Sequence, residues 1–398
     1  MILLFYFFAG VLILLSFRSF RGGVEYLRFF KDELAKPTSN FTPFATIIAP
    51  CRGLDTGLAD NLSCLLEQDY PDHEIIFVVD DKNDAAVPVI EEVSRKAAKI
   101  IKLIVAPSAN GCSQKIENLR EAVLHAADES EIFVFVDSDA RPSKDWLRSL
   151  VAPLQEKSVG AATGYRWFIS EKPSFSSEMR AAWNASIASA LGPKIKTNFC
   201  WGGSMAIRRD AFERIDMHEK WRGVLSDDFV VTRAMNAAGL PIVFVPQALT
   251  VSIEDCGFRQ LLEFTTRQMK ITRVYAPHLW LLSFFGSGVF NAVMIAAFLI
   301  EMFRQKNDFV VFAAIATIVL VSIFGIGKSW LRLKAVKLVL TECEPELSRQ
   351  FLTQNTLWLL TPALFLYNSL AAWMSRRLKW RGITYELKSP TETVIITD

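Results

Sequence analysis

The chain lacks the patterns that mark disulfide scaffolds, zinc sites and the common nucleotide-binding loops. No GxGxxG follows the first predicted strand, and no GxxxxGK followed by Ser or Thr occurs, which disfavours a Rossmann dehydrogenase and a P-loop ATPase. No CxxC pair is present, so the cysteines indicate reduced thiols in a cytoplasmic domain. The formal net charge of +2 over 398 residues gives no reason to expect a nucleic acid polymer as a partner. The cysteines are Cys51, Cys64, Cys112, Cys200, Cys256 and Cys343.

Long apolar runs are absent between residues 40 and 275 but present at both ends of the chain. Hydrophobic residues make up 51% of the sequence and charged residues 22%, a mixture that predicts a soluble domain joined to membrane segments. Residues 1–17 carry no charge and are just long enough to span a bilayer. With no basic residue before the run and no small-residue cleavage site after it, we interpret it as an uncleaved transmembrane anchor.

Basic residues follow this anchor. Arg18, Arg21, Arg28 and Lys31 make residues 18–40 a basic juxtamembrane linker. Because positive charge favours the cytoplasmic side, we expect the N-terminus outside and the next domain facing the cytoplasm. The chain is therefore predicted to be an integral, multi-pass membrane protein.

The late part of the chain predicts a transmembrane bundle over residues 279–374, followed by a basic tail over 375–398. Three late spans after the anchor would place the C-terminus outside, whereas the basic tail favours the inside. The first run contains Gly286 and Gly288 and could instead be re-entrant, so both topologies stay open. The late apolar runs are 279–303, 309–327 and 357–374.

Residues 41–257 read as alternating strands and helices, the pattern of an α/β domain. Fully apolar strands in such an alternation predict a mostly parallel sheet with helices on both faces. Ligands of these sheets bind at the carboxyl ends of the strands. The predicted strands are 44–50, 75–81, 100–107 and 132–139, and the predicted helices are 58–68, 85–99 and 113–127.

Acidic side chains follow two of these strands. Asp80 and Asp81 end one strand, and Asp137 and Asp139 end another as a D-x-D pair. A lone acid at such a place is usually a turn residue. Two pairs at one sheet edge repel each other unless a cation lies among them, and Mg²⁺ or Mn²⁺ suits carboxylates combined with phosphate oxygens. The pattern predicts metal-assisted transfer from a nucleotide diphosphate.

A third acidic pair lies at Asp227 and Asp228, after the glycine pair of "CWGGSMAIRRDAF" and just before a helical stretch. Asp227 could be only a helix cap. As a catalytic group, one of the two could accept the proton of a hydroxyl nucleophile.

The order of these motifs resembles the inverting family-2 nucleotide-sugar glycosyltransferases with a GT-A fold, and more closely the ceramide glucosyltransferase branch. The resemblance covers roughly residues 44–275. It implies a GT-A catalytic domain that uses a divalent metal, Mg or Mn. The segments that carry it are "CRGLDTGLADNLSCLLEQDYPDHEIIFVVDDKNDAA", "SQKIENL", "VDSDARP", "GGSMAIRRDAF" and "SDDF".

The resemblance also implies a role for each matching residue. Asp228 would be the general base, with Asp227 beside it, and Asp139 would bind the metal together with Asp137. Lys115 would approach the donor, although a solvated helix lysine is an equally good interpretation. The residues expected to bind the nucleotide sugar are Pro50, Cys51, Arg52, Asp80, Asp81, Lys115 and Asp137.

The family's last motif, (Q/R)xxRW, has only an approximate counterpart. It falls in the predicted interfacial segment 258–278, where two registers fit and neither has the Trp. Cations there would stabilise the leaving diphosphate, or would rest on anionic lipid headgroups. The absence of the Trp argues against a polymerase. The candidates are Arg267, Gln268, Lys270 and Arg273.

The resemblance thus predicts an inverting hexosyltransferase that moves one sugar from a UDP-sugar to the hydroxyl of a membrane lipid such as ceramide. Transfer to a polyprenyl phosphate and processive polysaccharide synthesis are the alternatives among enzymes. A catalytically silent lipid-binding scaffold is the alternative from another class. In the tail, Trp380, Arg381 and Tyr385 are expected either to fold back on the active-site edge or to be solvated.

Overall fold

The computed structural model describes residues 2–95, 99–303 and 308–396, and the chain forms two compact units. We call them the sheet unit (32–171, 190–255 and 376–398) and the helical unit (1–31, 172–189 and 256–375).

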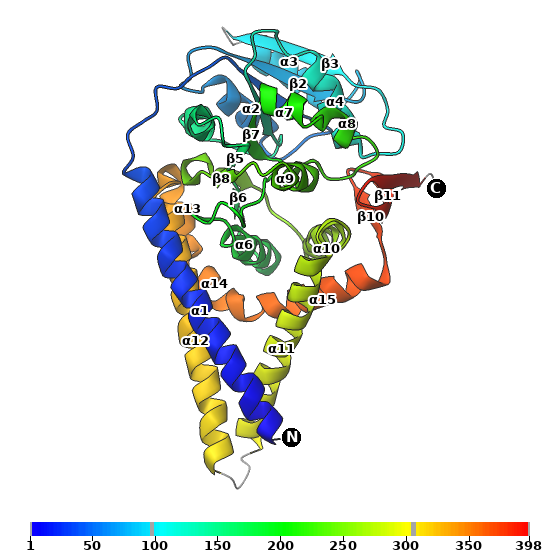
Figure 1. The fold of residues 1–398 in the computed structure, drawn as a ribbon. Helices are drawn as coiled ribbons and strands as arrows, with labels where there is room; N and C mark the ends of the chain where they lie inside the picture. Colours follow the sequence, from blue (N-terminus) through cyan, green and yellow to red (C-terminus); the bar gives the residue numbers. More distant parts are fainter. Residues whose placement is uncertain (1, 96–98, 304–307, 397–398) are drawn as a thin grey trace. The chain divides into compact units, whose positions relative to one another are not determined.

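A seven-stranded sheet organises the sheet unit, in the order β3-β2-β1-β4-β7-β5-β8 (Figure 1). The first four strands of this order are mutually parallel, and β7 is antiparallel to both of its neighbours. Every residue of β2 and β4 is buried, as expected for strands covered on both faces. The strands are β1 (Ala45–Pro50), β2 (His73–Val79), β3 (Ile100–Val105), β4 (Ile132–Val136), β5 (Ala161–Thr163), β7 (Ser204–Arg208) and β8 (Ile242–Phe244).

The helices of this unit follow the apolar spacing of the sequence. The three predicted helices are confirmed to within a few residues, and residues 96–98 of the predicted helix 85–99 lie outside the described residues. Ser113 caps α4, because its hydroxyl accepts a hydrogen bond from the Ile116 amide at 3.2 Å. The helices are α2 (Leu58–Leu66), α3 (Ala86–Arg95), α4 (Gln114–Leu124), α5 (Trp146–Val151), α7 (Arg209–Arg214), α8 (Met217–Lys220) and α9 (Asp227–Ala237), with short 3₁₀ turns at Ala152–Gln155 and Pro246–Ala248.

Two smaller sheets complete the sheet unit. β6 (Arg166–Ile169) pairs in parallel with β9 (Thr250–Ile253). The tail forms an antiparallel sheet of β10 (Arg377–Trp380), β11 (Ile383–Ser389) and β12 (Glu392–Ile396). The tail docks on the same unit, where the Gln114 amide donates to the Tyr385 hydroxyl at 3.2 Å. The expectation that the tail folds back is confirmed, and the solvated alternative is wrong.

Three helices of the helical unit are long and apolar enough to cross a membrane, namely α1, α11 and α12. They pack against one another through a buried apolar cluster and lie side by side in Figure 1. The cluster contains Ala9, Leu12, Val293, Met294 and Val321. The helices are α1 (Ile2–Leu34), α6 (Phe175–Ala188), α10 (Phe258–Tyr275), α11 (Pro277–Met302), α12 (Asp308–Lys337), α13 (Glu344–Arg349), α14 (Phe351–Thr356) and α15 (Thr361–Met374), with 3₁₀ turns at Thr341–Cys343 and Leu357–Leu359.

Two sequence interpretations are corrected here. The predicted linker 18–40 is helical as far as Leu34, because its apolar residues continue the helical spacing of the anchor. The predicted third late span is bent by 56° between Phe351–Leu359 and Thr361–Met374, which makes it a broken span or a re-entrant loop. The first late run, by contrast, forms the continuous helix α11.

Candidate active site

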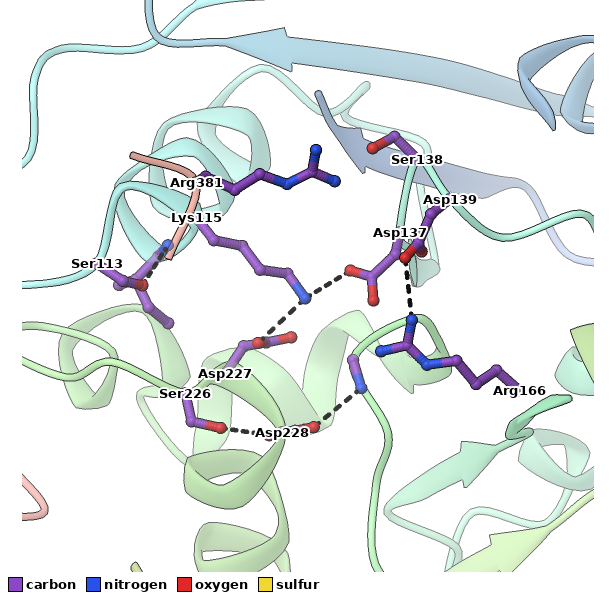
Figure 2. Close-up of polar contacts among 12 residues, drawn as sticks. Ser113, Lys115, Asp137, Ser138, Asp139, Arg166, Ser226, Asp227, Asp228 and Arg381 are labelled. Atoms are coloured by element: carbon purple, nitrogen blue, oxygen red, sulfur yellow. Dashed lines mark hydrogen bonds and ion pairs between the residues drawn. The ribbon is translucent and has the colours of Figure 1, made fainter. Parts of the chain in front are cut away.

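The ends of β2 and β4, which lie on either side of β1, place the predicted acidic residues at one edge of the main sheet. β1 and β4 are paired in parallel, with Ile48 opposite Phe135. Asp137 and Asp139 follow directly after β4, and Figure 2 shows both side chains turned toward the groups that arrive from α4, α9 and β6. The edge therefore gathers residues that lie far apart in the sequence.

Lys115 lies between two carboxylates at this edge. Its Nζ is 2.7 Å from Asp137 Oδ1 and 3.3 Å from Asp227 Oδ1 (Figure 2). Only 14% of its side chain is exposed, so the interpretation as a solvated helix lysine is wrong. Burial lowers the pKa of Lys115, but the two carboxylates outweigh burial and raise the pKa above its usual value. Burial likewise raises the pKa of Asp137, and here Lys115 and Arg166 outweigh it and lower the pKa.

Asp139 pairs with Arg166, the first residue of β6. Arg166 Nη1 is 3.0 Å from Asp139 Oδ2, and the guanidinium lies 5.0 Å from the ring centre of Trp201. The other oxygen of Asp139, Oδ1, is buried and has no hydrogen-bond donor. Asp139 thus keeps one oxygen available for a further positive partner.

Asp227 is buried at the start of α9, with 3% of its surface exposed. Burial raises its pKa to about 6, against the opposing effect of Lys115. Its Oδ2 has no donor, and a Cβ built on Gly202 would lie 2.0 Å from that oxygen. A Cβ on Gly203 would lie 2.7 Å from Asp137 Oδ2. The glycine pair is therefore required because its backbone passes directly against the two carboxylates.

Asp228 is half-buried and held by several donors. Its Oδ1 accepts hydrogen bonds from the Ser226 hydroxyl and, at 2.7 Å, from the Phe229 amide. Its Oδ2 accepts a longer bond of 3.4 Å from the Gly202 amide (Figure 2). Asp228 is thus an oriented carboxylate, less buried than Asp227.

The predicted nucleotide edge is only partly assembled. Arg52 Nη1 lies 2.6 Å from Asp80 Oδ2, so these two residues form an ion pair beside the end of β1. Asp81 is exposed and accepts a hydrogen bond from the Asn83 amide, which makes it a turn residue. Cys51 is buried, and its thiol donates to the Ala49 carbonyl at 3.6 Å. Pro50 is the last residue of β1.

The tail brings a further cation to this edge. Arg381 and Gly382 form the two-residue turn between β10 and β11, with φ values of 48° and 84°. Arg381 Nη2 lies 2.5 Å from Asp55 Oδ1, and the Ser138 hydroxyl donates to Asp55 Oδ2 at 2.6 Å. A non-glycine residue in this left-handed conformation is strained, so the turn holds Arg381 in place at an energetic cost.

The predicted diphosphate cations lie on α10, in the helical unit. Arg273 Nη1 donates to the carbonyls of Ala372 and Trp373 at 2.6 and 3.0 Å, so this arginine is held by the end of α15. Arg267 lies over the ring of Phe264. Burial lowers the pKa of Lys270. The role of Arg267, Gln268 and Lys270 at the diphosphate stays a prediction, and the register that relies on Arg273 is disfavoured.

Comparison with known proteins agrees with this geometry. The sequence model of Glycosyl transferase family 21 matches residues 12–393. The chain belongs to this family. Its relatives include ceramide glucosyltransferases from Candida albicans, 30% identical over 27% of this chain, and Komagataella phaffii, 27% identical over 30% of it. The matched segments span 22% and 24% of those relatives' own length.

Among solved structures, the family 21 chain is similar to a mannosyltransferase from Pyrobaculum calidifontis that was solved with GDP-Man and Mn²⁺. The identity is 18% and the TM-score is 0.43, over 90% of this chain and 99% of that one. The predicted resemblance to ceramide glucosyltransferases is confirmed. The predicted α/β domain with a mostly parallel sheet is confirmed, as are helices before and after it that are long and apolar enough to cross a membrane.

The charges at the sheet edge of this family 21 protein are unbalanced. We call the five carboxylates there the acid edge; they are accompanied by only three cations, Lys115, Arg166 and Arg381. Within the described ranges, no group of three His, Cys, Asp or Glu residues could by itself enclose a metal ion. A site with one available Asp139 oxygen and excess negative charge nevertheless fits Mg²⁺ or Mn²⁺, which take their other ligands from phosphate and water. The acid edge comprises Asp55, Asp137, Asp139, Asp227 and Asp228.

Sequence reasoning missed three parts of this site. Arg166 begins the short apolar run "RWFI", where a charged residue followed by buried aromatic residues was the available signal. The glycine pair was noticed, but its contact with the carboxylates was not predicted. Asp55 gave no signal, because it lies in a loop whose partners come from β4 and the tail.

Proposed function

We propose that this family 21 protein is an inverting hexosyltransferase that moves one sugar from a UDP-sugar to the hydroxyl of a ceramide-like lipid. The observation that carries the proposal is Asp228, an oriented and half-buried carboxylate beside the Lys115–Asp137–Asp227 network. Sugar transfer from a nucleotide requires a base next to a charged edge that can interact with the diphosphate. The ceramide-like acceptor is supported by the relatives that match part of the chain.

The donor would lie across the carboxyl ends of β1, β2 and β4. Arg52 and Asp80 flank the predicted nucleotide end. Asp139, with Asp137, would hold a divalent cation, Mg or Mn. When bound, this cation supplies charge that stabilises the leaving diphosphate. Arg166 and Lys115 keep the two carboxylates in fixed positions, so the edge is ordered before the donor arrives.

Asp228 acts on the acceptor. It accepts the hydroxyl proton while the oxygen forms a bond to the anomeric carbon of the sugar, and the bond from that carbon to the diphosphate breaks. Attack from the face opposite the diphosphate inverts the anomeric configuration. Asp227 is a positioning residue, because it is buried and touches Lys115 rather than solvent.

The membrane helices favour a cytoplasmic catalytic unit. The basic end of α1 packs against the basic end of α12, since a Cβ on Gly23 would lie 3.3 Å from Lys328 Cα. This end therefore collects Arg18, Arg21 and Lys328, and positive charge favours the cytoplasmic side. The sheet unit begins directly after that end of α1, at residue 32.

The test is a membrane assay with labelled UDP-glucose, UDP-galactose and GDP-mannose, each offered with ceramide, diacylglycerol or a sterol. We expect a single-sugar lipid product of inverted configuration, identified by mass and by NMR of the anomeric proton. Asp72→Asn, a change in an exposed turn, is the control for Asp228→Asn. A polymer, a sugar phosphodiester or a retained configuration would contradict the proposal.

A further inference from the structure

Two cations on the last third of α12 face the interior of the helical unit. Lys328 and Arg332 are one helical turn apart and follow the charge-free run 309–327. Arg332 is only 4% exposed, and Lys328 is half-buried. We call these two residues the cation pair. Ionisable groups in such a place are rare, because removing them from water is costly.

Among the residues that the structure describes, the cation pair has no negative partner. Arg332 Nη2 donates to Gln354 Oε1 at 3.1 Å, and Nη1 donates to the Ser189 hydroxyl at 3.4 Å. Both of these acceptors are neutral. Throughout the described part of the chain, no carboxylate forms an ion pair with Lys328 or Arg332.

Buried donors without acceptors lie in the same place. Arg332 Nε and Gln354 Nε2 are both buried and have no hydrogen-bond partner. Because a buried unpaired donor is destabilising, such groups usually have an acceptor that belongs to a ligand or water. Two positive charges and two unused donors specify a ligand that is anionic and accepts hydrogen bonds.

We propose that Lys328, Arg332 and Gln354 bind the phosphate group of an anionic membrane lipid. The surroundings favour a lipid over a free phosphate ion, because the cation pair lies on a helix that is long and apolar enough to cross a membrane. The other face of this helix exposes apolar side chains that can contact acyl chains. A basic pocket between membrane helices is a recognised type of site for anionic headgroups. This site is separate from sugar transfer and does not depend on it. The apolar side chains are Ile323, Ile326 and Trp330.

The experiment uses the full chain in nanodiscs of phosphatidylcholine, with or without phosphatidylglycerol, and follows thermal unfolding by tryptophan fluorescence. We expect phosphatidylglycerol to raise the midpoint by about 5 °C, the order expected for a saturating ligand. Arg332→Gln and Lys328→Gln should lose most of this rise. Lys334→Gln should keep it, because Lys334 is exposed on the same helix and lies over Trp330. Native mass spectrometry should show retained lipid in the wild-type protein but not in Arg332→Gln or Lys328→Gln.

Three outcomes would overturn the proposal. An equal rise in all four proteins would mean that the lipid acts on the general surface charge. No rise of the wild-type midpoint on addition of phosphatidylglycerol would mean that the cation pair does not bind this lipid, and that Arg332 is an uncompensated buried charge. Protection of the detergent-solubilised protein by inorganic phosphate, as large as that by phosphatidylglycerol, would exclude the lipid as the source of the anion. If Arg332→Gln does not fold, Lys328→Gln still tests the proposal, because Lys328 is only half-buried and its replacement should be tolerated.

Discussion

The acid edge and the cation pair are both buried charge clusters, and they are unbalanced in opposite directions. At the acid edge, five carboxylates meet three cations. At the cation pair, a buried guanidinium has only neutral partners. Charges removed from water are costly unless they are compensated, so each imbalance indicates a ligand of the opposite sign. The comparison teaches that uncompensated buried charge supports both proposals, a cation bound with the substrate at the acid edge and a lipid phosphate bound at the cation pair.

The largest expected effect comes from Asp228, the carboxylate that we propose takes the proton. Asp228→Asn should lower kcat by about 10³-fold, because loss of a positioned general base removes 10²–10⁴-fold in rate. Donor binding should persist, since the charges around Asp139 are untouched. Single-turnover kinetics together with nucleotide titration would check this, and near-normal turnover would remove Asp228 from the mechanism.

The next largest effect is expected from Asp139→Asn, which changes the charge at the acid edge but leaves the proposed base in place. Asp139→Asn should lower turnover by about 10²-fold and weaken nucleotide binding as well, because it removes the Asp139–Arg166 ion pair and reduces the excess negative charge. EDTA should produce a similar loss in the wild-type protein that Mg²⁺ or Mn²⁺ reverses. Calorimetric titration with UDP measures nucleotide binding in the variant and in the wild-type protein treated with EDTA. Metal-independent binding of UDP would contradict the cation at the acid edge.

Neutralising a cation in each cluster should have opposite effects on stability. Lys115→Gln leaves Asp137 and Asp227 unpaired and should lower the free energy of unfolding by about 3–5 kcal/mol. Arg332→Gln, measured in phosphatidylcholine alone, should be neutral or stabilising because no carboxylate loses a partner. Denaturant titration in the same nanodiscs compares the two. An equal loss of unfolding free energy in Lys115→Gln and Arg332→Gln would contradict the expected difference between the acid edge and the cation pair.

The tail contributes a smaller effect. Arg381→Ala removes an ion pair in which 40% of the arginine side chain is exposed, and partly exposed pairs contribute about 1 kcal/mol or less. We expect the KM for the donor to rise by up to about fivefold, with little change in kcat. Arg381→Gly would separate the two roles of this position, because glycine relieves the strained turn while it removes the charge. Unchanged KM in both variants would make the tail purely structural.

The smallest effect is the pH dependence of stability from Asp227. Its pKa is about 6 in the folded protein and about 3.9 in an unfolded chain. Between these values the folded state binds a proton that the unfolded state has released, so the stability from this group falls as pH rises from about 4 to 6. Asp227→Asn should therefore show a smaller decline in thermal midpoint across this window. Parallel profiles for the two proteins would contradict the raised pKa.

Much of the acid edge could be predicted because it depends on local pattern. Asp137 and Asp139 follow a strand whose apolar run fixes its burial and direction, and the edge rule for parallel sheets then places them. Asp80 and Asp81 show the limit of this reasoning. The two are adjacent, yet Asp80 pairs with Arg52 whereas Asp81 accepts a hydrogen bond from the Asn83 amide.

The cations could not be predicted in the same way. Sequence places Lys115 on a helix but does not determine which partners its side chain reaches. Arg166 and Arg381 arrive through β6 and the tail, and pairings between such distant segments are set by tertiary packing rather than by local spacing. The cation pair could not be predicted either, because Lys328 and Arg332 follow the charge-free run 309–327 and their burial depends on how α12 packs.

The docked tail also constrains how often the chain crosses the membrane. Residues 255 and 376 belong to the same unit, so both lie on one side of the bilayer. Between them the chain must cross an even number of times. If α11 and α12 provide two crossings, the bent segment 351–374 turns back without completing a third. If α1 also crosses once, residue 2 lies on the opposite side of the bilayer from residue 376. The docked tail therefore requires an even number of membrane crossings between residues 255 and 376.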